Sequence, residues 1–72
     1  MISKIEGLEN CTLLEELELY DNRIQKLENI SHLKNLKFLD LAFNVIREIP
    51  EGSLDLPSLK KIFLGANKIK KI

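Results

Sequence analysis

Apolar residues return at fixed intervals along this chain, and three stretches of it superimpose without a gap. They read LEELELYDNRI from position 14, LKFLDLAFNVI from position 36 and LKKIFLGANKI from position 59. The copies therefore start 22 and then 23 positions apart. Each copy has the form L-x-x-[LI]-x-L-x-x-N-x-I. Periods of this length are typical of proteins built by stacking similar structural units.

The first part of each copy predicts a short β-strand. In the second copy Leu39 and Leu41 point to one side of the strand, and their neighbours Phe38, Asp40 and Ala42 point to the other. The apolar residues then recur every three positions, which favours a short 3₁₀-like or extended return. A continuous amphipathic helix is disfavoured because strict spacing by three drifts around a helix of 3.6 residues per turn. We therefore predict an α/β solenoid, right-handed and curved, with a short parallel β-sheet on its concave face and 3₁₀ or extended segments on its convex side.

The repeat frame divides the chain into one segment of four parts. These are a partial repeat 1–13, whole repeats 14–35 and 36–58, and a partial repeat 59–72. Cys11 falls on an apolar position of the frame and is predicted to fill the core, whereas His32 is predicted to be a solvated surface residue. Nothing resembles the polar caps that close a stack of repeats. We therefore expect either a longer parent chain or self-association of copies edge to edge.

One polar residue is common to all three copies, the asparagine that follows each predicted strand. Backbone amides and carbonyls point inward where the strand turns away, and leaving such a group buried without a partner costs about 1–3 kcal/mol. An asparagine amide both donates and accepts. We predict a structural ladder that joins adjacent turns, formed by Asn22, Asn44 and Asn67.

The predicted concave face carries charged and aromatic side chains in an uneven order. It is acidic in the first copy, mixed and aromatic in the second, and basic in the third. Aromatic residues beside charges are typical anchors of protein interfaces, whereas charges alone also occur on a merely solvated face. The candidate partner-binding residues are Glu18, Tyr20, Phe38, Asp40, Phe43 and Phe63. Phe43 has an alternative, which is to pack beneath the neighbouring turn.

Composition and charge argue against several other functions. Eleven basic and eleven acidic side chains cancel, so no strong field favours nucleic acid or an anionic membrane, although residues 1–40 carry −3 and residues 41–72 carry +3. One histidine and one cysteine cannot assemble a zinc site, and three scattered glycines form no phosphate-binding loop. We expect a non-catalytic chain without a metal or cofactor. The start lacks the apolar core of a signal peptide, which favours an intracellular location, nuclear and/or cytoplasmic.

The repeat frame resembles the 22-residue class of leucine-rich repeats. Within that class the chain is most similar to the leucine-rich regulatory subunits of protein phosphatase 1, through LYDNRIQKLENI at 19–30, LDLAFNVIREI at 39–49 and LKKIFLGANKIKKI at 59–72. The resemblance implies a non-catalytic partner of the phosphatase catalytic subunit. It also implies that acidic and aromatic residues at the strand centres bind that subunit. The matching positions here are Asp40 and Phe63, with Glu18 in the first copy.

Two other functions remain open from the residues alone. The first is another leucine-rich adaptor, for instance in an axonemal motor or a splicing particle, whose aromatic residues serve a different partner. The second is a purely structural segment that extends a larger solenoid and binds nothing. The stretch PEGSLDLP at 50–57 adds one residue to the strict 22-residue spacing, and we expect this insertion to lie on the convex side.

Overall fold

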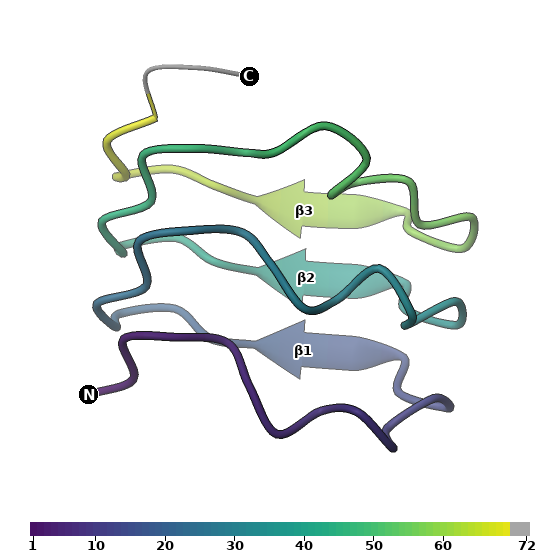
Figure 1. The fold of residues 1–72 in the computed structure, drawn as a ribbon. Coiled ribbons are helices and arrows are strands. Elements are labelled where there is room, and N and C mark those ends of the chain that lie inside the picture. The colour runs from purple at the N-terminus through teal and green to yellow at the C-terminus, as the bar shows by residue number, and fades with distance from the viewer. Residues whose placement is uncertain (70–72) are drawn as a thin grey trace.

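Three short parallel strands form the only sheet in the part of the chain that the computed structural model describes, residues 1–69. The strands are β1 (Glu16–Glu18), β2 (Phe38–Asp40) and β3 (Lys61–Phe63). They lie in chain order, and the chain returns between them along the opposite side, so that successive turns stack on one another (Figure 1). Each turn therefore contributes one strand to the sheet and one return segment behind it. Positions 70–72 of the predicted partial repeat 59–72 lie outside the described residues.

The strand pairing follows the spacing of the repeated sequence. Leu17 pairs with Leu39, and Leu39 pairs with Ile62, although the second of these intervals is one position longer than the first. Parallel hydrogen bonds continue past the strand ends, where the Leu41 amide donates to the Phe63 carbonyl (2.9 Å) and the Phe43 amide donates to the Gly65 carbonyl (3.0 Å). The extra residue of the second interval is thus absorbed in the return segment, and the strands stay in line.

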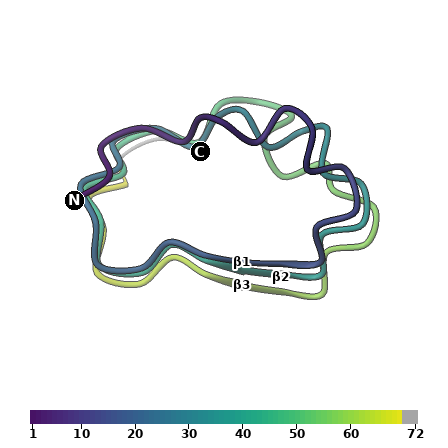
Figure 2. The same ribbon diagram turned by 90° about the horizontal axis from the view of Figure 1, so that it is seen from below.

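The return segments are extended and contain single turns instead of helices. In the second turn the Leu33 amide donates to the Ile30 carbonyl (2.9 Å), and the Leu36 amide donates to the Leu33 carbonyl (3.1 Å). These i-to-i+3 bonds link apolar residues spaced by three, but each is an isolated turn. Seen along the stack, the turns superimpose as flattened loops with the strands on one long side (Figure 2). Residues 1–69 contain no helix, so the α part of the predicted α/β class is not met there.

A related finding concerns membranes. No helix within residues 1–69 is long and apolar enough to cross a bilayer.

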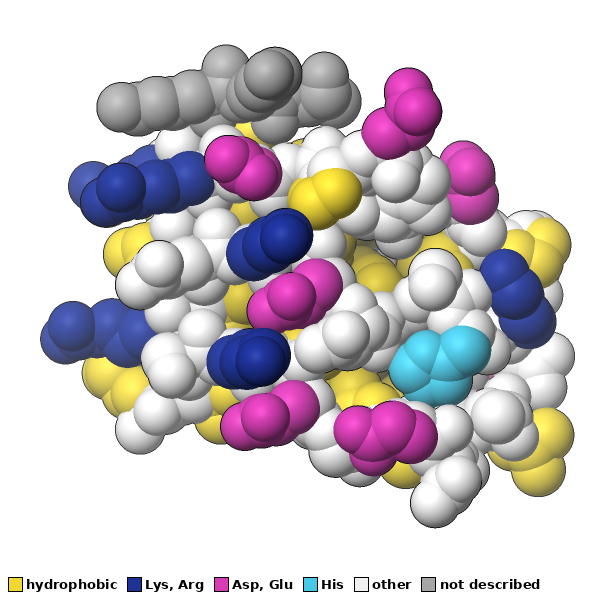
Figure 3. Space-filling view, in the orientation of Figure 1, with side chains coloured by type: hydrophobic (Ala, Val, Ile, Leu, Met, Phe, Trp, Pro, Cys, Tyr) yellow, Lys and Arg dark blue, Asp and Glu magenta, His cyan; other side chains and the backbone are white. Residues whose placement is uncertain are grey.

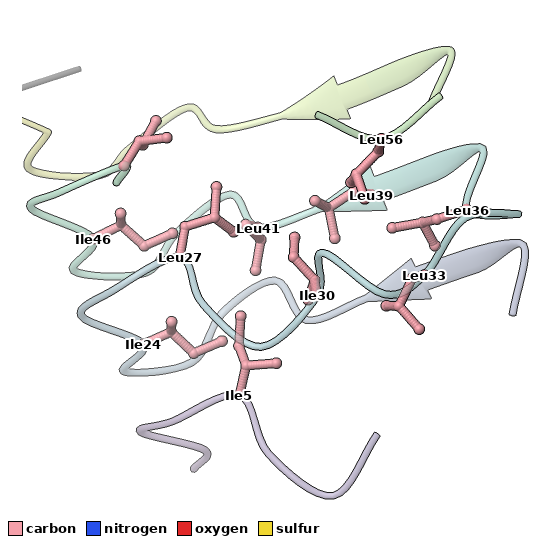
Figure 4. Close-up of a cluster of buried hydrophobic side chains, with 11 residues drawn as sticks. Ile5, Ile24, Leu27, Ile30, Leu33, Leu36, Leu39, Leu41, Ile46 and Leu56 are labelled. Carbon is pink, nitrogen blue, oxygen red and sulfur yellow. The ribbon is translucent and has the colours of Figure 1, made fainter. Parts of the chain in front are cut away.

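The core lies between the sheet and the return segments and is made only of aliphatic side chains (Figure 4). It is best closed in the middle turn, where Leu39 and Leu41 from the sheet meet Leu27 and Leu36 from the return, all with no exposed surface. Cys11 packs against this core but is only half-buried. The buried members are Ile5, Ile24, Leu27, Ile30, Leu33, Leu36, Leu39, Leu41, Ile46, Ile49 and Leu56.

Truncating the centre of this core is expected to lower the stability of the chain sharply. Leu39→Ala removes a side chain that is wholly buried in the central strand, and such changes cost about 3 kcal/mol through lost burial and the cavity left behind. Urea unfolding followed by far-UV circular dichroism measures the loss. Leu13→Ala is the matched control because Leu13 is 80% exposed. Equal stability of the two variants would contradict a core centred on Leu39.

Candidate protein-interaction surface

The outward side of the three strands forms one continuous surface, which we call the sheet face. Along each strand the middle residue enters the core, so the first and third residues point outward. The strand residues of the sheet face are Glu16, Glu18, Phe38, Asp40, Lys61 and Phe63. Four of these six side chains are exposed, and the two on β2 are half-buried between their neighbours.

The strand register arranges these residues in two rows across the sheet. One row runs from Glu16 through Phe38 to Lys61, and the other runs from Glu18 through Asp40 to Phe63. Paired residues of adjacent strands on one face lie close enough for their side chains to interact. The structure thus brings Glu18, Asp40 and Phe63 together in one line, as neighbours across the strands.

The two phenylalanines of the sheet face are in contact, although they belong to different rows. The ring centroids of Phe38 and Phe63 lie 5.6 Å apart and the ring planes make an angle of 71°, an edge-to-face arrangement. The Lys61 Nζ atom lies 6.0 Å from the centroid of the Phe63 ring. Phe63 nevertheless remains 45% exposed. The rings therefore hold each other in place and still present apolar surface to the outside.

Asp40 is held in a fixed position beside this aromatic pair. Its Oδ1 atom accepts a hydrogen bond from the Ala42 amide at 3.1 Å, which satisfies a backbone donor just after the strand. The side chain is half-buried, whereas Glu18 in the same row is exposed. Within residues 1–69, the ion pair found is that between Lys37 and Glu15 (3.5 Å), at the edge of the sheet face. Such exposed pairs contribute little to stability.

Tyr20 and Phe43 lie beyond the ends of the strands, away from the phenylalanine pair. Tyr20 is 55% exposed and Phe43 is 64% exposed. Of the two alternatives left open for Phe43, the structure excludes packing beneath the neighbouring turn. The backbone of Phe43 has a φ of 58°, and the same conformation recurs at Asp21 and Ala66, one residue before each asparagine of the predicted ladder. A bulky side chain is rarely found in this left-handed region.

The three asparagines occupy equivalent places where the strands end. Asn44 is 6% exposed; its Oδ1 accepts from the Ile24 amide (3.0 Å), and its Nδ2 donates to the carbonyls of Leu19 and Leu41, each at 3.0 Å. Asn67 likewise accepts from Ile46 and donates to Leu41. Asn22 accepts from Ile2 and donates to Leu19. Each side-chain amide thus bonds to the preceding turn and also to a carbonyl of its own turn.

A second set of side-chain hydrogen bonds joins the turns on the return side, and sequence reasoning missed it. Asn29 Nδ2 donates to the Ile5 carbonyl (2.6 Å), the His32 Nε2 atom lies 2.7 Å from the Leu8 carbonyl, and Ser53 Oγ donates to the Leu27 carbonyl (3.3 Å). His32 is therefore a half-buried surface residue with a hydrogen bond to the preceding turn, so the prediction of a solvated surface residue is met only in part. These three residues differ in type, so no repeated residue in the sequence indicates the hydrogen bonds. The backbone of these return segments is nevertheless regular, because Gly7, Asn29 and Gly52 share a positive φ.

Comparisons with known proteins agree with the repeat pattern. The family profile for two copies of leucine-rich repeats matches residues 12–51 and, overlapping them, 34–72. Leucine-rich repeat-containing protein 23 of Bos taurus is 39% identical over 70 residues, which are 93% of this chain and 20% of that protein. The volume-regulated anion channel subunit LRRC8A of Homo sapiens is 39% identical over 62 residues, 82% of this chain and 8% of the subunit.

A third relative also matches most of this chain. Fibromodulin of Bos taurus is 39% identical over 67 residues, 90% of this chain and 16% of fibromodulin. The chain thus spans a fifth or less of each of these relatives. No solved structure matches it. None of the three relatives is described as a phosphatase subunit, so the comparisons support the repeat class and leave the phosphatase resemblance a hypothesis.

Replacing Asn44 by alanine is expected to destabilise the chain by about 2 kcal/mol. The change leaves the Ile24 amide without its partner inside the stack, whereas the Leu19 carbonyl keeps the bond from Asn22. An unsatisfied buried group costs about 1–3 kcal/mol. Urea unfolding measures the loss, with Asn35→Ala as the control because Asn35 is exposed. A loss below about 1 kcal/mol, or one equal to that of the control, would show that water replaces the amide.

Glycine at position 43 is expected to give a more stable chain than alanine at that position. Phe43→Gly and Phe43→Ala both remove the exposed ring, but only glycine adopts a φ of 58° without a steric cost. The left-handed conformation costs other residues about 1–2 kcal/mol, which the greater flexibility of glycine in the unfolded chain offsets in part. The glycine variant should therefore be about 0.5–1 kcal/mol more stable than the alanine variant in thermal unfolding. The reverse order would mean that residue 43 has no left-handed backbone in solution.

Proposed function

The chain belongs to the leucine-rich repeat family, and from that premise we propose that it is a segment of a right-handed, curved solenoid whose concave face is the sheet face and binds a protein partner. Proteins of this family are generally non-catalytic interaction modules, and stacked repeats commonly use extended concave surfaces for binding. The partner would contact the strand residues of the sheet face directly. The chain would contribute recognition, without a catalytic step of its own.

The exposed aromatic pair is the single observation that carries this proposal. Phe63 keeps 45% of its surface exposed although it sits on a strand beside Phe38, where a polar residue would be compatible with the same fold. Aromatic residues that are rigidly held at the centre of a surface, with charges around them, are the usual anchors of protein interfaces. Asp40 lies next to Phe63 in the same row and adds a fixed acceptor. The sheet face thus has an apolar centre and a charged surround.

The catalytic subunit of protein phosphatase 1 is the partner that we propose first. The support is the resemblance of the strand segments to regulatory subunits of that enzyme. In those subunits, acidic and aromatic residues at the strand centres contact the catalytic subunit. Here the matching residues are Asp40 and Phe63, with Glu18 as the equivalent residue on β1, and each is the last residue of its strand. The geometry is compatible with that assignment because the three residues form one row across the sheet.

Capture of purified phosphatase catalytic subunit by the immobilised chain tests the proposal. The variant Asp40→Lys with Phe63→Ala is expected to bind about thirtyfold more weakly, since two anchor residues at about 1 kcal/mol each change Kd by that factor. The matched control is Glu51→Lys with Leu13→Ala, which makes the same charge change and removes an exposed apolar side chain away from the sheet face. Circular dichroism establishes that all three proteins are folded.

The possible results separate the partner from the surface. No capture by the native chain would overturn the phosphatase as partner. Equal capture by the native chain and the sheet-face variant would keep the phosphatase and overturn the sheet face as its binding surface. Loss of capture by the control variant as well would place the contact elsewhere on the chain.

A further inference from the structure

The charges of the sheet face are separated by sign, strand by strand. The outward residues of β1 are Glu16 and Glu18, and Glu15 precedes them; the outward residue Lys61 of β3 is preceded by Lys60. From this arrangement we infer that the partner of the sheet face carries basic side chains over β1, acidic side chains over β3 and apolar side chains over the Phe38–Phe63 pair. The inference rests on the proposed function and specifies the chemistry of its partner.

The opposite side of the molecule shows that this separation is not a general property of the chain. On the return side, Lys and Arg alternate with Asp and Glu over the visible surface (Figure 3). Lys26 and Glu48, for example, lie on adjacent turns and form a parallel bridge through their backbones. Interspersed charges of both signs are what a solvated surface requires. The sheet face departs from that pattern.

The separated charges are poorly neutralised within the chain. Lys37 pairs with Glu15 at 3.5 Å, a contact between side chains that are 50% and 61% exposed. Glu18 and Asp40 are instead paired across adjacent strands, and like charges placed opposite each other destabilise a sheet. A basic group from a partner would offset this repulsion. The β1 side of the sheet face therefore favours a cation more than an isolated surface carboxylate would.

The distance between the two charged ends limits the shape of the partner. Adjacent strands lie about 4.8 Å apart, so β1 and β3 are separated by about 10 Å, roughly one Debye length at physiological salt. The two ends therefore act as separate charges. An extended segment advances about 3.3 Å per residue, so a segment that crosses the strands needs its basic and acidic residues about three to four positions apart. The apolar residues between them would then lie over the aromatic pair.

Selection of peptides from a random 12-residue display library tests this inference. Peptides selected on the native chain are expected to contain basic and acidic residues about three to four positions apart with apolar residues between them. On the variant Glu16→Lys with Glu18→Lys, the basic residues should be replaced by acidic ones. The control Glu6→Lys with Glu51→Lys makes the same charge change at exposed residues outside the sheet face and should select the same peptides as the native chain.

A synthetic peptide with the sequence most enriched on the native chain supplies the quantitative readout. Fluorescence anisotropy should show binding about tenfold weaker to Glu16→Lys/Glu18→Lys, and binding to the native chain should weaken as salt is raised. Phe63→Ala should weaken binding irrespective of salt. Binding that needs Phe63 but shows no charge order, or is unchanged in the Glu16/Glu18 variant, would overturn the inference and leave the proposed function intact. If no selected peptide depends on Phe63, the sheet face as a binding surface is itself overturned.

Discussion

The asparagine at the end of each strand is the constraint on which the rest of this structure depends. At that point the backbone leaves the sheet, and its amides and carbonyls face the inside of the stack. The amide of Asn44 meets donors and acceptors of two turns at once, through Ile24, Leu19 and Leu41. Because these bonds have fixed geometry, they set the position of one turn on the next. The aliphatic core supplies most of the driving force for stacking but has no direction of its own.

The strand frame and the outward residues of the sheet could be predicted from the sequence because they follow from two periodicities. The spacing of the three copies gives the pairing of Leu17, Leu39 and Ile62, and alternation along a strand then places Asp40 and Phe63 outside. The edge-to-face contact of Phe38 with Phe63 could not be predicted in this way. It joins diagonal positions, and it depends on how far each ring tilts, which no pattern of letters determines.

Other features escaped prediction for a physical reason that they share. The donors of Asn29, His32 and Ser53 all bond to carbonyls of the preceding turn, yet the three side chains are chemically unlike. A buried carbonyl needs a donor and accepts any that reaches it, so selection of residue type is weak and the sequence shows no repeat. The left-handed backbone before each ladder asparagine was hidden in the same way. Asp21, Phe43 and Ala66 share a φ near 58°, although their side chains differ in size and charge.

Phe43 and the charges of the sheet face are both unfavourable in the free chain, for different physical reasons. Phe43 combines a left-handed backbone with a ring that is 64% exposed, so it is unfavourable both in conformation and in solvation. Glu18 and Asp40 place two carboxylates opposite each other across β1 and β2, and such a pairing is unfavourable in a sheet. Marginally stable domains do not gain from such features in the free state. Phe43 follows the end of β2, and the two carboxylates lie on β1 and β2, whereas the return side has mixed charges and hydrogen-bonded turns. Unfavourable features at the strands and just beyond them are expected where a partner supplies the missing contacts, whichever protein that partner is.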